Sequence, residues 1–320
     1  MRILALVPGG IGDQILLFPM LDDLKKAYPN AEIDVVVEPR AMGTYRVCKS
    51  VYRTISFDFQ GRNSLADWGN LLGMIREREF DAAISLERSW MTGFLLWLTG
   101  IPSRLGYVGG SDQLFLTQTV PQKSDQYAAC MYHDLLKGLD IQTQCPDLAI
   151  SVPARDITWA EAEQKRLGIA GQGYLLIDGG TGEIEAGKRA DSHYPAQSWQ
   201  SIIQDFQRRQ PDMPIVLVQT PAEQELVATL LKSNPNLKVT SPADLGKLAA
   251  IITGASLVLC PVGVAMHLAV ATQTFTLALF GSENPKKLLP ASDRFVGIQS
   301  LTGKISDIDP QTILQKVWGG

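Results

Sequence analysis

The sequence predicts an α/β protein made of two doubly wound, Rossmann-like domains that face each other across a cleft. Three observations predict this fold. Short apolar strands alternate with amphipathic helices along the chain. The alternation stops at a polar, proline-bearing stretch between Cys145 and Pro153 and then restarts. The chain has 320 residues, about twice the length of a typical domain.

The first half, residues 1–150, is expected to form one domain around a parallel sheet. Its strands are continuous apolar runs, which are typical of strands buried on both faces. They are expected at 2–7, 32–38, 53–58, 80–86 and 103–107. Helical spacing of apolar residues is found at 14–27, 40–49, 64–77, 88–99 and 125–138.

The second half, residues 151–320, repeats the pattern after a helix expected at 157–167. Its strands are expected at 173–178, 214–219, 237–240, 256–260 and 275–280. Helices are expected at 196–209, 221–233, 242–253, 264–272 and 309–317. Ligands of doubly wound sheets bind at the carboxyl ends of the strands, so an active site is expected between the two halves.

Composition limits the function classes. A hydrophobic content of 45% and a charged content of 19% indicate a globular protein, and a net charge of −4 without a long basic run argues against nucleic-acid binding. The four cysteines are scattered and form no Cys-x-x-Cys pair. We therefore expect reduced thiols, a cytoplasmic protein, and neither a metal site nor a bound cofactor. Glycines interrupt the first apolar run, so no signal peptide is predicted.

The longest apolar block, residues 90–100, is too short to span a bilayer. It is expected to be a buried helix. The alternative is a helix that lies on the inner face of a membrane, with Trp90 and Trp97 as anchors and the protein attached peripherally.

The first strand, Ile3–Val7, runs directly into Gly9-Gly10-Ile11-Gly12-Asp13. This spacing is neither the dinucleotide fingerprint Gly-x-Gly-x-x-Gly nor a P-loop. A strand–glycine–helix junction brings backbone N–H groups close to whatever binds at the end of the sheet. Asp13 is predicted to accept a proton from an attacking hydroxyl group in the cleft. The alternative is that the glycines relieve a turn and Asp13 only caps the helix.

Three ordered stretches resemble glycosyltransferase family 9, which comprises the heptosyltransferases of lipopolysaccharide core assembly and their relatives. The first is the glycine loop with the following Pro19 and the segment 24–34. The second is 98–107, which contains Thr99-Gly-Ile-Pro-Ser-Arg104-Leu-Gly106. The third is Met266-His267-Leu-Ala-Val-Ala271 with Ala278-Leu-Phe-Gly281.

The resemblance implies a GT-B-type fold and an inverting, metal-independent transfer from a nucleotide-sugar donor, such as ADP-heptose, to a saccharide or lipid-linked acceptor. The N-terminal half would hold the acceptor beside the loop of Gly9, Gly10 and Gly12, with Asp13 as general base. The C-terminal half would hold the donor diphosphate. The residues expected there are Gly179, Gly180, Lys188, Arg189, Gly263 and His267.

Each of these donor-side residues has a second interpretation. Gly179 and Gly180 would let a ligand approach the backbone, or would simply form a turn. His267 would donate to a phosphate or ribose oxygen, or would be half-buried against its helix. His133 is expected to be structural.

The donor side also departs from the family pattern. Val262-Gly263-Val264 stands where the family usually has Asp-Ser/Thr-Gly, and Ser192 replaces the lysine of its Lys-x-Trp-Pro segment. Lys188 and Arg189 would compensate, but they share their loop with four acids, Asp178, Glu183, Glu185 and Asp191. A catalytically inactive member that binds or scaffolds a protein partner is therefore the second hypothesis. An epimerase or hydrolase on the same fold is the third.

Overall fold

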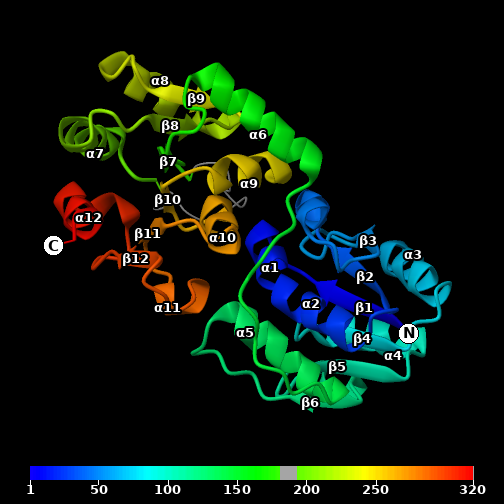
Figure 1. Ribbon diagram of the computed structural model, residues 1–320. Coiled ribbons are helices and arrows are strands. Elements are labelled where there is room, and N and C mark those ends of the chain that lie inside the picture. The colour runs from blue at the N-terminus through cyan, green and yellow to red at the C-terminus, as the bar shows by residue number, and fades with distance from the viewer. Residues whose placement is uncertain (181–192, 320) are drawn as a thin grey trace. The chain divides into compact units, whose positions relative to one another are not determined.

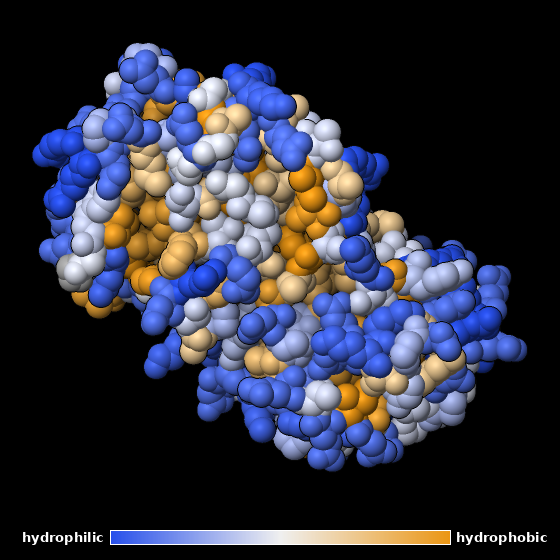
Figure 2. Space-filling model, in the orientation of Figure 1, coloured by the Kyte–Doolittle hydropathy of each residue, from blue (hydrophilic) through white to orange (hydrophobic). Residues whose placement is uncertain are grey.

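The computed structural model describes residues 1–180 and 193–319. The chain divides into two compact units, Met1–Ser151 and Val152–Gly320. Figure 1 shows each unit as a sheet flanked by helices. Figure 2 shows that hydrophilic residues cover most of the visible periphery of each unit. No helix in the described ranges combines the length and the apolarity that crossing a membrane requires.

The N-terminal unit is built on a six-stranded parallel sheet with the order β3-β2-β1-β4-β5-β6. The order reverses between β1 and β4, so the carboxyl end of β1 lies at the switch point where such sheets bind ligands. The strands are β1 (Arg2–Val7), β2 (Glu32–Val37), β3 (Arg53–Ser56), β4 (Ala82–Ser85), β5 (Ser103–Tyr107) and β6 (Gln118–Val120).

Helices cover both faces of this sheet. Leu71 and Ile75 of α3 and Leu95 and Leu96 of α4 share one buried cluster with Leu4 of β1. Figure 1 shows α1, α2 and α5 together on the other face, and α2 contacts α5. The α-helices are α1 (Ile11–Leu16), α2 (Phe18–Ala27), α3 (Leu65–Arg76), α4 (Trp90–Thr99) and α5 (Ala128–His133). The 3₁₀ segments are η1 (Pro39–Val47), η2 (Gln113–Phe115) and η3 (Asp134–Leu139).

The C-terminal unit repeats the same topology with the order β12-β11-β10-β7-β8-β9. Its switch point lies between β7 and β10, which pair directly. The strands are β7 (Leu175–Ile177), β8 (Ile215–Val218), β9 (Lys238–Thr240), β10 (Leu257–Pro261), β11 (Thr276–Phe280) and β12 (Phe295–Gln299).

Seven α-helices of the described residues belong to this unit. Trp199 and Phe206 of α7 are packed with Leu230 of α8 and Ile313 of α12 in one buried cluster. Helix α9 contacts both α6 and α10. The helices are α6 (Ala154–Leu167), α7 (Ala196–Arg209), α8 (Gln224–Ser233), α9 (Leu245–Thr253), α10 (Val264–Ala271), α11 (Pro285–Leu288) and α12 (Pro310–Val317), with 3₁₀ segments η6 (Pro221–Glu223) and η7 (Ile305–Asp307).

The predicted strands are confirmed, but several helices differ from expectation. The helix predicted at 14–27 begins at Ile11 and is divided at Leu17, because Pro19 starts a second helix there. The segment expected at 40–49 is a 3₁₀ helix, and 125–138 divides into α5 and η3. Strands β6 and β12 were not predicted.

The expected burial of the apolar block at 90–100 is wrong for one side of the helix. Helix α4 buries Thr92, Gly93, Leu95 and Leu96. Its Trp90 and Trp97 are 54% and 53% exposed. The block is apolar around its whole circumference, whereas the sheet covers only one side of it.

Candidate functional site

The carboxylate of Asp13 lies at the carboxyl end of β1 and accepts hydrogen bonds from Gly10 and Tyr132. Helix α1 begins at Ile11, so Gly10 is its N-cap and Asp13 is its third residue rather than the cap itself. The Gly10 N–H donates to Asp13 Oδ2 at 3.1 Å. The Tyr132 hydroxyl group, from α5, donates to Asp13 Oδ1 at 3.0 Å. Asp13 therefore stabilises the helix start and also has a fixed orientation.

Tyr132 remains a hydrogen-bond donor at any physiological pH. Burial raises the pKa of its phenol well above the usual value, and the neighbouring charge of Asp13 raises it further. The sequence contained no signal for this residue, because 119 positions separate it from Asp13.

Position 9 requires a glycine because the Asp13 carboxylate lies close to its backbone. A Cβ atom at Gly9 would lie 2.5 Å from Asp13 Oδ2. Gly10 occupies the N-cap in extended conformation, and Gly12 lies within α1. The predicted loop therefore brings Gly9, Gly10, Gly12 and Asp13 together.

A buried glutamine that we did not predict holds this loop through hydrogen bonds to its backbone. Gln14 is fully buried, and its amide donates to the carbonyl oxygens of Val7 at 2.9 Å and Gly9 at 3.2 Å. Its Oε1 accepts a 2.5 Å hydrogen bond from Tyr45. The backbone carbonyls at the strand end are thus satisfied without water, which fixes the loop.

His133 has the structural role expected for it. It is buried on α5, and its Nε2 lies 3.0 Å from Asp23 Oδ2. Asp23 also accepts hydrogen bonds from Lys26 at 2.8 Å and Thr143 at 2.8 Å. Burial alone would raise the pKa of Asp23, but these donors outweigh it and hold the pKa below its usual value. The network joins α2 to α5, the helix that carries Tyr132.

The donor-side residues lie at the switch point of the C-terminal unit. The Asp178 N–H donates to Leu259 O at 3.1 Å, so the ends of β7 and β10 are adjacent. Gly179 and Gly180 follow β7, and Gly263 and His267 follow β10. The structure therefore brings these four predicted residues to one edge of the sheet. Lys188 and Arg189 lie outside the described residues.

The two glycines after β7 are explained by packing within the unit. Gly180 has a φ of +73°, and its N–H donates to Asp178 Oδ1 at 2.9 Å. A Cβ at Gly180 would lie 2.6 Å from Pro261, and one at Gly179 would lie 2.5 Å from Leu226. Protein atoms occupy the space beside both residues. This favours the interpretation that the two glycines form a turn over the interpretation that they let a ligand approach the backbone.

Gly263 is the N-cap of α10 in extended conformation and, as a glycine, has no side chain to cap this helix start. His267, one turn further on, is 4% exposed rather than half-buried. Burial lowers its pKa to about 4, so the imidazole is neutral at pH 7. Among the described residues its Nδ1 has no hydrogen-bond partner. At pH 7 the His267 side chain is therefore a neutral imidazole and does not supply a positive charge to a diphosphate.

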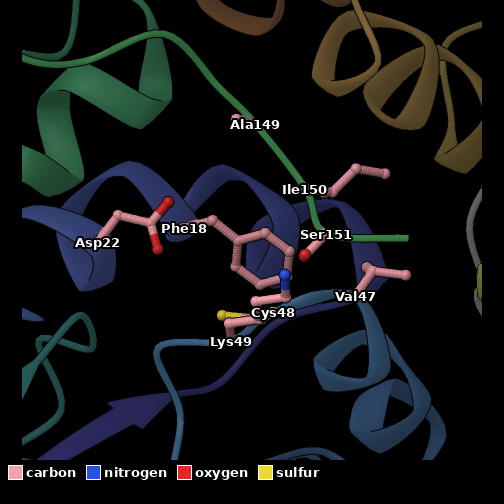
Figure 3. A pocket seen from close by; sticks show the side chains of 8 residues that line it. All are labelled: Phe18, Asp22, Val47, Cys48, Lys49, Ala149, Ile150 and Ser151. Carbon is pink, nitrogen blue, oxygen red and sulfur yellow. The ribbon is translucent and has the colours of Figure 1, made fainter. Parts of the chain in front are cut away.

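A cavity of about 170 Å³ lies elsewhere in the N-terminal unit. Figure 3 shows residues 149–151 passing beside Phe18 of α2, with Cys48 and Lys49 on the opposite wall. Burial raises the pKa of the Cys48 thiol to about 12, so it is not a reactive thiolate. The cavity is smaller than the roughly 300–1,000 Å³ of small-molecule sites. Within the described residues, no group of three or more His, Cys, Asp and Glu side chains could hold a metal ion.

Comparison with known proteins decides the family. The model of glycosyltransferase family 9 (heptosyltransferase) matches residues 68–317. The chain belongs to glycosyltransferase family 9. The GT-B-type fold inferred from the sequence is confirmed by the E. coli heptosyltransferase WaaC solved with ADP, which is similar at a TM-score of 0.75 and 19% identity, over 100% of this chain and 97% of that chain.

Curated relatives of this family 9 chain have different roles. It is 23% identical to the "Photosynthetic NDH subunit of subcomplex B 1, chloroplastic" of Arabidopsis thaliana, over 98% of this chain and 72% of that protein. It is 22% identical to lipooligosaccharide heptosyltransferase 2 of Haemophilus influenzae, over 95% of this chain and 90% of that protein. The relatives of this chain thus include a protein named as a transferase and a protein named as a subunit of a larger assembly.

Proposed function

We propose that this chain is an inverting, metal-independent glycosyltransferase that moves a sugar from a nucleoside-diphosphate donor to a saccharide or lipid-linked acceptor. The observation that carries the proposal is the Asp13 carboxylate, fixed by Gly10 and Tyr132 at the switch point of a family 9 fold. The presence of ADP in the similar E. coli structure supports an adenine nucleotide as the donor class. ADP-heptose and lipopolysaccharide synthesis at the cytoplasmic face of a membrane fit this proposal.

In the proposed reaction an acceptor hydroxyl group attacks the anomeric carbon of the donor sugar. The bond from that carbon to the diphosphate oxygen breaks, and the diphosphate leaves with the electron pair. Asp13 takes the proton from the attacking hydroxyl group as the new bond forms. The diphosphate would be stabilised by the N-terminus of α10 and by Lys188 and Arg189, without a metal or another cofactor.

A second candidate function is a non-catalytic member that binds a protein partner. Two observations favour it. The donor motif is replaced by Val262-Gly263-Val264, and packing alone explains Gly179 and Gly180. The similarity to a relative named as an NDH subunit supports this candidate. In this case Asp13 would be retained only for the start of α1.

Asp13→Asn separates the two candidates, and the chain offers a matched control. Asp67 is also the third residue of its helix, α3, and accepts a 2.8 Å hydrogen bond from the N-cap N–H of Ser64. Asp13→Asn should lower turnover about 100-fold or more with little change in donor affinity, whereas Asp67→Asn should leave turnover unchanged. Turnover is measured as release of nucleoside diphosphate from a panel of ADP-, UDP- and GDP-sugars with saccharide acceptors.

Calorimetric titration with ADP, UDP and GDP tests the donor side directly. Binding of one nucleotide at micromolar to millimolar concentration supports the transferase. The non-catalytic role would be the better explanation if two results are found. No nucleotide gives a binding heat, and Asp13→Asn and Asp67→Asn lower stability equally without any effect on turnover.

A further inference from the structure

Helix α4 presents a row of large apolar side chains to solvent. Trp90, Phe94 and Trp97 are 54%, 37% and 53% exposed. Their rings form a continuous series, with centroid distances of 6.3 Å from Trp90 to Phe94 and 5.8 Å from Phe94 to Trp97. Phe115 of η2 joins the series at 5.7 Å from Phe94. We call the following residues the α4 aromatic face: Trp90, Met91, Phe94, Trp97, Leu114 and Phe115.

This face is not needed for the core of the unit. Leu95 and Leu96 on the opposite side of α4 already fill the space against the sheet. Leu114, beside Phe115, is 92% exposed and Met91 is 36% exposed. A contiguous apolar patch of this kind on a globular protein usually marks an interaction site.

The stretch of chain that forms most of the face contains no acidic residue, although an acid lies directly before it and another directly after it. Residues 88–111 contain Arg88 and Arg104 and neither Asp nor Glu, in a chain whose net charge is −4. Glu87, directly before the stretch, accepts a 2.7 Å hydrogen bond from Thr92 of α4, and Asp112, directly after it, is buried. Residues 88–111 by themselves therefore carry two positive charges, opposite in sign to the net charge of the whole chain.

Backbone carbonyls rather than carboxylates hold the arginines near α4. Arg88 donates to Val108 O at 3.1 Å, and Arg104 donates to Phe115 O at 2.7 Å. Arg76 of α3 donates to Leu98 O at 3.2 Å, at the other end of α4. Neutral partners leave the positive charge in place, so these guanidinium groups would attract an anionic surface.

The size and chemistry of the face suit a lipid surface better than a protein. If a large side chain offers about 200 Å², the exposed fractions amount to on the order of 500 Å². A stable protein interface needs about 800 Å² on each partner. Shallow insertion into a bilayer needs only a few side chains, and tryptophan favours the boundary between headgroups and acyl chains.

We propose that the α4 aromatic face is a membrane-docking surface that inserts its tryptophans into the headgroup region of an anionic phospholipid bilayer. Arg88, Arg76 and Arg104 would supply the electrostatic attraction. The proposal goes beyond the proposed transfer reaction and stands independently of it, because docking requires neither Asp13 nor a nucleotide.

Flotation of the full chain with vesicles tests the proposal. Vesicles of equal parts phosphatidylcholine and phosphatidylglycerol should bind the protein, and vesicles of phosphatidylcholine alone should bind it less. Trp90→Ser combined with Trp97→Ser should weaken binding at least tenfold. The matched control is Phe275→Ser with Leu301→Ser, since these apolar residues of the C-terminal unit are 51% and 104% exposed. It should bind like the wild type.

A second variant tests the charge without altering the apolar face. Arg88→Gln should weaken binding to the anionic vesicles about fivefold, as expected for the loss of one cation near a charged lipid surface, and should leave binding to phosphatidylcholine unchanged. Circular dichroism and thermal unfolding check that each variant is folded.

Two results would overturn the proposal: the wild type fails to float with anionic vesicles, or the double tryptophan variant floats as well as the wild type. If the wild type fails to float, sedimentation equilibrium of the wild type and the double variant follows. A dimer that the double variant abolishes would make the face an interface between copies of the chain. Turnover of sugar nucleotides does not enter any of these outcomes, so failure here is distinguishable from failure of the transferase.

Discussion

The hydroxyl group of Tyr132 donates to Oδ1 of Asp13 at 3.0 Å and so connects α5 with the loop that follows β1. This contact determines how the proposed general base is oriented. The other carboxylate oxygen is used by the Gly10 N–H at the start of α1. One side chain therefore both stabilises the start of α1 and has a fixed orientation at the end of β1.

Tyr132→Phe should lower turnover about tenfold and lower stability by no more than about 3 kcal/mol. The ring still fills its site, but the carboxylate loses a hydrogen bond of roughly 1.5–3 kcal/mol, as is typical for bonds to charged groups. Tyr107→Phe is the control, because Tyr107 is also buried in this unit and its hydroxyl group donates to a backbone oxygen, Met131 O, at 3.0 Å. Steady-state kinetics of both variants would show equal rates if Tyr132 were merely structural.

Gln14→Ala should destabilise the N-terminal unit by about 2–4 kcal/mol. The substitution leaves the carbonyl oxygens of Val7 and Gly9 and the hydroxyl group of Tyr45 without their buried partner, and each such group costs about 1–3 kcal/mol, partly relieved by water. Urea unfolding followed by circular dichroism measures the change. The exposed Gln142→Ala should stay within about 0.5 kcal/mol of the wild type, and a similar value for Gln14→Ala would contradict the proposed support of the loop.

Much of the fold could be predicted from the sequence because its determinants are local. The strands are apolar runs bounded by polar turns, and the glycine loop sits between a strand and a helix, where its backbone role is readable. Strand β6, with two of its three residues exposed, has no such apolar run. Its pairing with β5 depends on tertiary structure, which the spacing of apolar residues in the sequence does not predict.

The candidate site could be predicted only where chemistry and position coincide. Asp13 follows the loop directly, so its place at the sheet edge was foreseeable. Tyr132 and Gln14 could not be identified, since a tyrosine on a distant helix and a buried glutamine acquire roles only through contacts made on folding. For His267 the sequence left a ligand-binding role and a half-buried histidine equally open, and its near-complete burial, which keeps the imidazole neutral, is known only from the structure.

His267 should make the C-terminal unit less stable as the pH falls from about 6.5 to about 4. Its folded pKa, about 4, lies below its ordinary value of 6.5, so the unfolded chain binds the proton more readily. The corresponding stability is fully present above pH 6.5 and is lost as the pH falls through this window, by up to about 3 kcal/mol. His267→Gln should reduce the slope of unfolding free energy against pH, whereas exposed His193→Gln should not. Equal slopes in all three proteins would exclude His267 as the source.

Gly180→Ala should destabilise the C-terminal unit more than Gly168→Ala, although the two glycines have φ angles of +73° and +71°. An alanine pays about 1 kcal/mol for this backbone region at either position. At Gly168 a Cβ meets nothing within 4 Å, whereas at Gly180 it lies 2.6 Å from Pro261 and forces β7 and β10 apart at their carboxyl ends.

Chemical denaturation of the two variants isolates the steric part of this cost, which we expect to be about 1–3 kcal/mol. If Gly180 is needed only for the turn, the substitution should affect nucleotide binding only by unfolding the protein. A nucleotide that binds the wild type should then bind folded Gly180→Ala with the same affinity. Selective loss of nucleotide binding by a folded Gly180→Ala would instead show that the backbone at this turn contacts the donor, and the packing explanation would be incomplete.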